Sequence, residues 1–415
     1  MSKLFEKNMS IKFTKIDWEK LTSAEKSINN FYCPDEFPYL CTINSQSFGL
    51  CKKNLEDCND LNSKSKIPII LNSNNDGEAF GYYTNNLNNR CINIYKDYEY
   101  VSTYNSKISE NFKILTYNIW GLMRKTTDEE QNKFLLNLLE IRMNAIIEEI
   151  KKENPDIICF QEMSNPAYSI LSKNLPEFQY KYEENFNHDK VSEDRNRNVE
   201  VHMFSKFPVK KFKLFGLEGN QHYFDSFFVA EFENLVIFNC YLQSGSKYSP
   251  GQENYWYHYA RCRIDQLKKI KVLMKEYDKT IILLGDFNFH LDGPFEEWVE
   301  THELKEFHDS WKIVNPNKDG FTENTDINLM RWNMKFQEKK FRYDGILFNK
   351  NLIPISAKLF GTDPIILNKN MSNLFEKYFI PSNKEKIKYL NNNDKIIAIH
   401  PSDHFGLLVN FKISL

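Results

Sequence analysis

Hydrophobic positions follow two periods along the chain, and from about residue 112 onward they predict strands alternating with helices. The segments "FKILTYNIW", "PDIICFQEM", "NVEVHMFS", "VAEFENLVIFNCYL", "TIILLGDFN", "FRYDGILF" and "HFGLLVNF" are short, apolar and bordered by turn residues, as strands are. Between the first two, the segment 128–153 carries Leu135, Leu139 and Ile146 at near-helical spacing, and Pro155 ends it. Strands outnumber helices and both carry apolar faces, which predicts layered sheets flanked by helices.

The first 110 residues have a different pattern. They mix short apolar pieces such as "KIPIILN" and "INIYKDYEYVS" with polar turns such as "NSNNDGE" and "NNLNN". This mixture indicates a small, irregular, strand-rich module whose function the sequence does not reveal. We therefore expect two parts, an amino-terminal module over residues 1–110 and a larger domain over residues 111–415.

Composition limits the classes of protein to consider. The chain has 415 residues, of which 41% are hydrophobic, so it can fill a sizeable core. Its formal net charge of −2 argues against a protein that coats nucleic acid nonspecifically, although a local basic groove stays open. No segment approaches the roughly 18 apolar residues of a membrane helix, and "MSKLFEKNMSIKF" lacks the apolar core of a signal peptide. We expect an intracellular, cytoplasmic or nuclear chain with mostly reduced cysteines.

Polar residues recur at or just beyond the ends of the apolar strands. A single buried carboxylate would usually cap a turn, because burying it without a partner is costly, but recurrence on six strands predicts that these residues converge on one site. Carboxylate and amide oxygens suit Mg²⁺, which is held by few carboxylates together with substrate phosphate oxygens. The residues are Asn118 on the first strand, Gln161 and Glu162 on the second, Tyr241 and Ser244 on a third, Asp286 and Asn288 on a fourth, Asp344 on a fifth, and Asp403 and His404 on the sixth.

Five segments, taken in order, resemble the motifs of a known superfamily. "LTYNIWGL", "ICFQEM", "LLGDFN", "FRYDGILF" and "PSDHFGLLVNF" resemble those of the endonuclease/exonuclease/phosphatase superfamily, from about residue 112 to the end of the chain. The resemblance implies an α/β fold, a four-layered sandwich of two mixed β-sheets flanked by helices. Within the superfamily, "DSWKIVNPNKDGFTENTDINLM" and the helix "RIDQLKKIKVLMK" are most similar to tyrosyl-DNA phosphodiesterase 2.

The resemblance implies a metal site. Glu162 would be the principal ligand of Mg²⁺, for which Mn²⁺ could substitute. Asn118 would contact the metal-bound water or the phosphate as a further part of the metal site, and Asp403 would lie close to the metal or its waters. An acidic site without a metal would repel a phosphate group.

The resemblance also implies the groups that act on the phosphate. Asp286 would orient or deprotonate the attacking water, and Asn288 would help to hold the water and the phosphate. His404 would donate to a phosphoryl oxygen, while Asp344 would bond the other ring nitrogen and fix the orientation of the imidazole. Tyr241 stands in "CYLQS" where tyrosyl-DNA phosphodiesterase 2 has a histidine and abasic-site endonucleases have a tyrosine, so phosphate contact is expected of it.

The resemblance implies that the substrate is a nucleic-acid phosphate ester, namely a 5′-phosphotyrosyl end of DNA or RNA. Arg263, Ser244 and Trp311 would line its binding groove. The partner would then be a nucleic-acid end or a protein–nucleic acid adduct, and the oligomeric state is left open.

Two departures from the pattern keep other functions open. Trp120 in "NIWGL" replaces an acidic residue, and Glu323 replaces an aromatic one. The alternatives are an abasic-type endonuclease, a sphingomyelinase or inositol-phosphate hydrolase of the same fold, and an inactive family member that acts as a binding module. The last is disfavoured because the expected site residues are all present.

Overall fold

The computed structural model consists of two compact units, which are described separately. The first unit comprises residues 1–92, 243–268 and 292–305, and the second comprises the rest of the chain. The residues described are 15–17, 39–42, 48–52, 78–82, 94–101, 106–121, 126–182, 201–217, 225–245, 256–292, 298–335, 338–379 and 387–414.

The described part of the first unit contains a four-stranded antiparallel sheet in the order β1-β2-β3-β4. Its strands are β1 (Lys15–Asp17), β2 (Tyr39–Thr42), β3 (Phe48–Lys52) and β4 (Glu78–Tyr82). The short helix α5 (Trp298–His302) contacts β4, and most of α4 (Trp256–Met274) also belongs to this unit. The amino-terminal module is therefore strand-rich, as expected.

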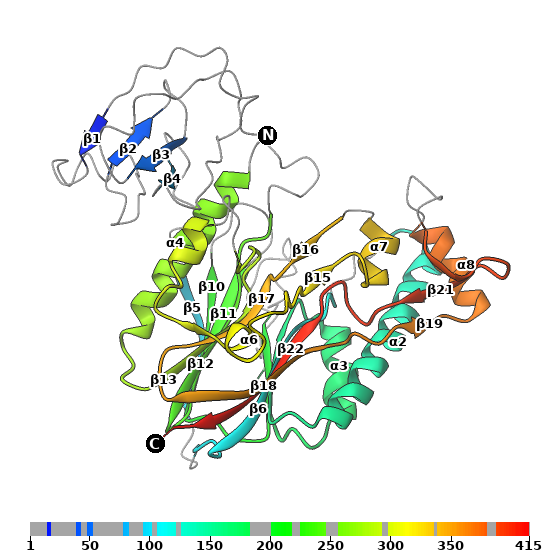
Figure 1. Cartoon of the computed structure of the whole chain (residues 1–415). Helices are drawn as coiled ribbons and strands as arrows, with labels where there is room; N and C mark the ends of the chain where they lie inside the picture. The colour runs from blue at the N-terminus through cyan, green and yellow to red at the C-terminus, as the bar shows by residue number, and fades with distance from the viewer. Residues whose placement is uncertain are drawn as a thin grey trace, which may run out of the picture. The chain divides into compact units, whose positions relative to one another are not determined.

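Two large sheets form the second unit (Figure 1). Among the described residues, the seven-stranded sheet has the order β14 (His308–Asp309), β17 (Asp344–Phe348), β13 (Thr280–Asp286), β12 (Leu235–Tyr241), β11 (Asp225–Glu231), β10 (Lys211–Leu217) and β5 (Ile94–Val101). The six-stranded sheet has the order β18 (Leu352–Phe360), β22 (Gly406–Ile413), β6 (Asn111–Asn118), β7 (Ile157–Gln161), β9 (His202–Ser205) and β8 (Tyr180–Tyr182).

Both sheets are mixed. The neighbours β12 and β13 run parallel in one sheet, and β6 and β7 run parallel in the other, while the remaining pairs are antiparallel. The prediction of two mixed sheets flanked by helices is confirmed. The pairing of β5 with β10 places residues 94–101 in the seven-stranded sheet, and the second unit begins at residue 93.

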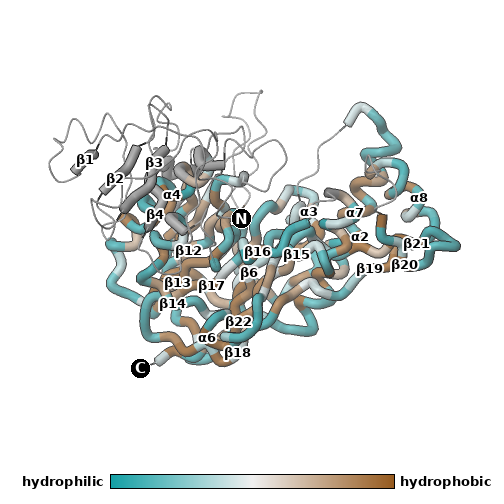
Figure 2. The backbone as a smooth tube through the Cα atoms, turned by 45° about the horizontal axis from the view of Figure 1, so that its top comes forward, coloured by the Kyte–Doolittle hydropathy of each residue, from teal (hydrophilic) through white to brown (hydrophobic). Residues whose placement is uncertain are grey.

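The core divides according to the alternation of side chains along the strands. On β6, Ile114 points between the two sheets, where it joins Ile282, Val409 and other apolar residues of both. Its neighbour Leu115 points the other way, into a second cluster under helices. Hydrophobic stretches accordingly run through the strands of this unit, and hydrophilic ones lie in peripheral segments (Figure 2).

Two helices cover the outer face of the six-stranded sheet. They are α2 (Glu129–Glu153) and α3 (Asn165–Asn174), which also contact each other. The Asp128 side chain accepts the Gln131 N–H and so caps the start of α2. The helix ends at Asn154, which adopts a left-handed conformation directly before Pro155.

Smaller elements complete the second unit. They are α6 (Ser310–Val314), α7 (Leu329–Lys335) and α8 (Lys369–Tyr378), the hairpin of β15 (Glu323–Asn324) with β16 (Lys340–Phe341), and the sheet β19 (Ile365–Ile366), β21 (Ile396–Ile399) and β20 (Tyr389–Asn391). A third apolar cluster joins residues of α2, α7 and α8 with β21. Within the described residues, none of the helices has the length and apolar character needed to cross a membrane.

Candidate active site

The strand faces that point between the sheets change from apolar to polar at one end. On β6 the inward positions run through Ile114 to Thr116 and then Asn118, all of which are buried. The same change occurs on β7 at Gln161, on β12 at Asn239 and Tyr241, and on β13 at Asp286. A strand period of two therefore brings polar side chains together where the apolar core ends.

Strand register aligns these ends with one another. Asn118 lies opposite Gln161, Tyr241 lies opposite Asp286, and Asp286 lies opposite Asp344. The backbones approach closely at Gly285, whose φ is +129° and where a Cβ atom would lie 2.0 Å from the Cys240 carbonyl oxygen. Only glycine fits this position, which explains the glycine of "GDF" one residue before the end of β13.

Asn118 bridges two carboxylates. Its Nδ2 donates to Glu162 Oε1 at 2.9 Å and to Asp286 Oδ2 at 2.9 Å, while its Oδ1 accepts the Trp120 N–H at 3.0 Å. The Tyr241 hydroxyl donates to Glu162 Oε1 at 3.1 Å. In this orientation Asn118 holds the two carboxylates together through its Nδ2, while its Oδ1 accepts a backbone N–H.

Backbone conformation helps to place Glu162. Its φ is +53°, in the left-handed region that a non-glycine residue with a long side chain rarely adopts. The chain thus turns directly after β7 instead of continuing its alternation. The turn brings the Glu162 carboxylate to the side chains of Asn118 and Tyr241.

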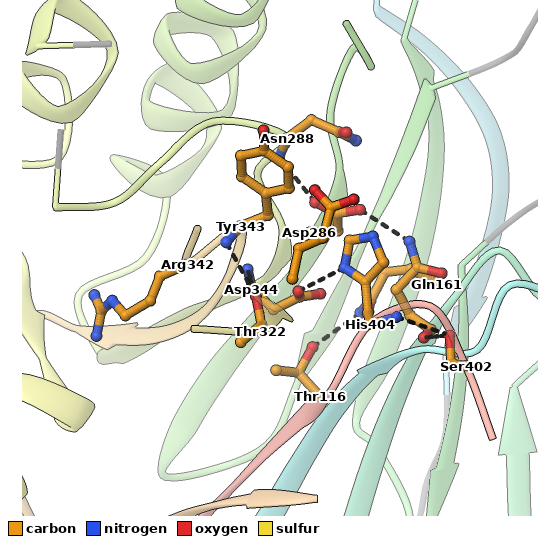
Figure 3. A network of polar contacts seen from close by, with 12 residues as sticks. Thr116, Gln161, Asp286, Asn288, Thr322, Arg342, Tyr343, Asp344, Ser402 and His404 are labelled. Carbon is orange, nitrogen blue, oxygen red and sulfur yellow. Dashed lines mark hydrogen bonds and ion pairs between the residues drawn. The ribbon is translucent and has the colours of Figure 1, made fainter. Parts of the chain in front are cut away.

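The group of side chains that Asn118 joins is the first half of the site. Asp344 and His404 form the second half (Figure 3). His404 Nδ1 and Asp344 Oδ2 are 2.8 Å apart, and both side chains are buried. The Thr322 hydroxyl accepts the N–H groups of Tyr343 and Asp344 and so fixes the backbone from which the carboxylate projects. The Ser402 hydroxyl accepts the His404 N–H at 3.3 Å and donates to the Asn118 carbonyl oxygen at 2.8 Å, which links the two halves.

The imidazole of His404 is held in its charged form. Burial alone would lower its pKa, but the charge and hydrogen bond of Asp344, with the charges of Asp286 and Asp403, raise the pKa of His404 well above 6.5. A doubly protonated ring donates from Nδ1 to Asp344, which leaves the Nε2–H as a donor for another group.

Asp286 lies between the two halves. Burial and the neighbouring Asp344 charge raise its pKa to about 8, and His404 and the Asn118 hydrogen bond oppose this shift. Its Oδ1 accepts the Asn288 N–H at 2.8 Å. Asn288 has a φ of +56°, which asparagine tolerates, and its side-chain Nδ2 donates to the Leu242 carbonyl oxygen. Asn288 therefore orients Asp286 through its backbone and anchors the turn through its side chain.

The cluster offers two possible sets of cation ligands. Donor atoms of Asp286, Asp344 and His404 lie within 4.8 Å of one another. However, His404 Nδ1 is bonded to Asp344 and the ring is held protonated, so it has no lone pair there for a metal. Glu162 and Asp286, which Asn118 bridges, form an all-oxygen set, and this is the chemistry that Mg²⁺ prefers.

Asp403 is buried in the loop before β22. Its charge raises the pKa values of both Arg142 and His404. Arg142 was not foreseen from the sequence, where it reads as one cationic residue on a helix. Asn239 was also missed, although it occupies an inward position of β12 between Ile237 and Tyr241, where polar residues are unusual. It accepts from Gln161 Nε2 at 2.6 Å and connects the two sheets below the site.

The three predicted substrate-binding residues have different environments. Trp311 is a core residue, 6% exposed, and its indole N–H donates to the Lys318 carbonyl oxygen. Arg263 and Ser244 belong to the first unit. Arg263 is fully buried, pairs with Glu300 at 2.7 Å and donates to the Gln243 carbonyl oxygen, while Ser244 is half-buried.

The cysteines of the described part differ from one another. Cys159 and Cys240 are buried free thiols whose pKa burial raises. Cys262 is disulfide-bonded, which contradicts the expectation of reduced thiols at this position. The side chains of the amino-terminal cysteines lie outside the described residues.

A two-sheet sandwich with carboxylates, amides and a histidine gathered at its strand ends defines a class of phosphate-ester hydrolases. A sequence profile of the Endonuclease/Exonuclease/phosphatase family matches residues 115–404, and the chain belongs to this family. A search of curated proteins finds no match.

A search of solved structures returns similar chains at low sequence identity. TDP2 from C. elegans is 18% identical over 73% of this chain and 75% of its own, with a TM-score of 0.47. D. rerio TDP2 complexed with a single-strand DNA product is 14% identical over 73% and 99%, with a TM-score of 0.45. A mannosyl-6-phosphatase of Bacteroides thetaiotaomicron is 15% identical over 72% and 99%, with a TM-score of 0.47.

Proposed function

We propose that the chain is a Mg²⁺-dependent phosphodiesterase that hydrolyses a nucleic-acid phosphate ester, with Mn²⁺ as a possible substitute cation. The observation that carries the proposal is the joining of Glu162, Asn118 and Asp286 with the Asp344–His404 pair at the ends of the strands. This arrangement contains an oxygen-rich cation site, a candidate general base and a cationic donor, which are the groups that phosphate-ester hydrolysis requires.

The residues fit a divalent cation. Glu162 and Asp286 supply hard oxygen atoms, and Asp344 Oδ1 is a buried carboxylate oxygen without a hydrogen-bond partner. The raised pKa of Asp286 has the same origin, because buried carboxylates that lie close together disfavour ionisation until a cation balances them. Glu162 would be the principal ligand, with Asp286 beside it. When bound, the cation would neutralise charge on the phosphoryl oxygens and so stabilise the transition state.

His404 serves as a fixed donor to the phosphate. Its ring is anchored through Nδ1 by Asp344, so the Nε2–H is free to bond a non-bridging phosphoryl oxygen and to stabilise the charge that develops there. Asp344 acts by holding this orientation and the positive charge of the ring.

Asp286 is suited to accept the proton of the attacking water. Without a cation the pKa of Asp286 is raised to about 8, and a bound cation would lower it toward the working pH, where a general base works best. As the water oxygen bonds to phosphorus, its proton passes to Asp286 and the phosphorus–oxygen ester bond breaks. The leaving oxygen departs with the bonding electron pair, which is favourable when it belongs to a phenol such as tyrosine.

The substrate that the sequence motifs favour is a 5′-phosphotyrosyl end of DNA or RNA. A chain with a formal net charge of −2 has no broad attraction for duplex, so a terminus bound at the site is preferred over an internal phosphodiester. Tyr241 beside Glu162 is the observation that favours the second candidate, an abasic-type endonuclease, because that branch also carries tyrosine in this motif.

The test compares three substrate classes at one Mg²⁺ concentration and moderate salt. We expect a 5′-phosphotyrosyl oligonucleotide to be cleaved faster than an abasic duplex is nicked, with sphingomyelin and inositol phosphates unchanged. The control is the double variant Glu162→Gln/His404→Ala, prepared in the same way, because it lacks both the proposed cation ligand and the phosphate donor, so cleavage at the wild-type rate in this variant would come from a contaminating enzyme. Faster nicking would favour the abasic branch. Turnover of a lipid or inositol phosphate alone would refute action on nucleic acid, and hydrolysis of none of them would favour a binding module.

A further inference from the structure

Arg142 occupies an unusual environment for a cationic side chain. It lies on α2, is 1% exposed, and is among the largest fully buried side chains of the described residues. Burial lowers its pKa to about 10, against the charges of Asp403 and Glu162, so it stays cationic at neutral pH. A buried guanidinium is costly unless its donors are used, and its contacts therefore indicate what it does.

The donors of Arg142 reach two loops that are far apart in the sequence. Nε donates to the Pro401 carbonyl oxygen at 2.7 Å. One terminal nitrogen donates to the carbonyl oxygens of Ile119 at 2.5 Å and Trp120 at 3.1 Å. The guanidinium carbon also lies 5.3 Å from the centre of the Trp120 ring, within cation–π range. One planar group thus fixes backbone atoms of both loops.

Each of these loops carries half of the site. The first follows Asn118, which holds Glu162 and Asp286. The second leads from Pro401 into Asp403 and His404, the partner of Asp344. The Ser402 hydroxyl joins the same loops directly through the Asn118 carbonyl oxygen. Arg142 supports this junction from the helix beneath it, and its charge faces the carboxylates of Asp403 and Glu162.

We propose that Arg142 is a positioning residue that keeps the loop after β6 and the loop before β22 in register, so that the Asn118 group and the Asp344–His404 pair face the same phosphate. Arg142 makes no contact with the reacting atoms itself. The proposal deepens the proposed function and rests on it for the kinetic readout, because small displacements of catalytic groups reduce turnover sharply.

The side chain must be arginine for this role. Lysine keeps the charge, but its single ammonium lacks the planar fork that reaches carbonyl groups of two loops at once. Glutamine removes the charge and most of the donors. A residue that merely packs α2 against the sheet would behave differently, and Leu139 is a matched control because it is also fully buried on α2.

The experiment measures amide hydrogen exchange in the full-length wild-type chain and in Arg142→Gln, Arg142→Lys and Leu139→Ala. In Arg142→Gln we expect the exchange rate to rise at least ~10-fold in peptides covering residues 118–121 and 400–405. This is the change expected when a hydrogen bond to a charged donor is lost. Peptides covering residues 226–231 should stay unchanged. Arg142→Lys should show the same selective rise, whereas Leu139→Ala should not raise exchange in these two loops more than elsewhere.

Kinetics provide the second readout. We expect Arg142→Gln to lower kcat at least ~10-fold with KM changed by less than about 3-fold, because alignment rather than binding is lost. Wild-type exchange in both loops of a folded Arg142→Gln or Arg142→Lys chain would overturn the proposal, as would full recovery of kcat by lysine or the same selective loop opening in Leu139→Ala. If the wild-type chain hydrolyses no phosphodiester, the proposed function fails while the exchange data still decide the role of Arg142.

Discussion

Replacing Asp344 by asparagine removes one charge from the pair that holds His404 and changes little else. The amide is close in size to the carboxylate, and its oxygen can still accept the Nδ1–H that now lies 2.8 Å from Asp344 Oδ2. The Thr322 hydroxyl continues to hold the backbone N–H of residue 344. The substitution therefore tests whether the charge of Asp344, apart from its shape, keeps His404 protonated.

The size of the effect depends on pH. In the wild-type chain, Asp344 is the largest contribution that raises the pKa of His404, so the ring stays charged through neutral pH. Without that charge, burial is opposed only by Asp286 and Asp403. If the effect of burial on the pKa and the effects of these two charges cancel, His404 has an ordinary pKa near 6.5. It is then about 75% protonated at pH 6 and about 3% protonated at pH 8. We expect the ratio of the rate at pH 6 to the rate at pH 8 to rise about 25-fold in the variant.

The assay is the hydrolysis of bis(p-nitrophenyl) phosphate with Mg²⁺ between pH 6 and pH 8.5. Asp156→Asn is the matched control, because Asp156 precedes β7 at the opposite end of the strand and accepts the Lys113 N–H there. Loss of activity at alkaline pH should appear in Asp344→Asn alone and should recover on acidification. Wild-type and Asp344→Asn profiles of the same shape would refute the idea that the carboxylate sets the charge of His404.

Three further predictions follow from the same contacts. Asp286→Asn and His404→Ala should each lower kcat by roughly 10²–10⁴-fold while the circular dichroism spectrum stays native, and wild-type rates would remove these groups from the mechanism. Folding raises the pKa values of Asp286 and His404, so the native state binds more protons than the unfolded state. The free energy of unfolding of the chelated chain, measured by urea titration, should therefore fall from pH 6.5 to pH 8.5. A rise over this range would contradict the prediction. Gly285→Ala should destabilise by more than about 3 kcal/mol, since its Cβ would collide with the Cys240 carbonyl group, and an unchanged urea midpoint would contradict the close approach.

The sheets and the first half of the site could be predicted because both follow from periodicity. Apolar alternation identifies β6, β7, β13 and β17, and a polar residue at an inward position near the end of a strand must point toward the site. The helix over 128–153 was also predictable, since its cap at Asp128 and its end before Pro155 are local signals.

Other features depend on contacts between distant residues. Arg142 reads as one more cation on an amphipathic helix, and only folding brings it to the carbonyl group of Pro401, 259 positions away. The sequence also does not reveal that the Asn118 amide donates to two carboxylates that lie 44 and 168 positions further along the chain. Likewise, nothing in residues 94–101 indicates that β5 pairs with β10.

The most direct test of a cation-dependent phosphodiesterase is Mn²⁺ binding by chelated protein, measured by calorimetry together with hydrolysis after the cation is restored. We expect the wild-type chain to bind Mn²⁺ and regain activity, Glu162→Gln to lose both in parallel, and His404→Ala to bind Mn²⁺ while remaining slow. Full activity in excess chelator would contradict the cation requirement. Binding that survives in Glu162→Gln but disappears in His404→Ala would place the cation on Asp286, Asp344 and His404 instead.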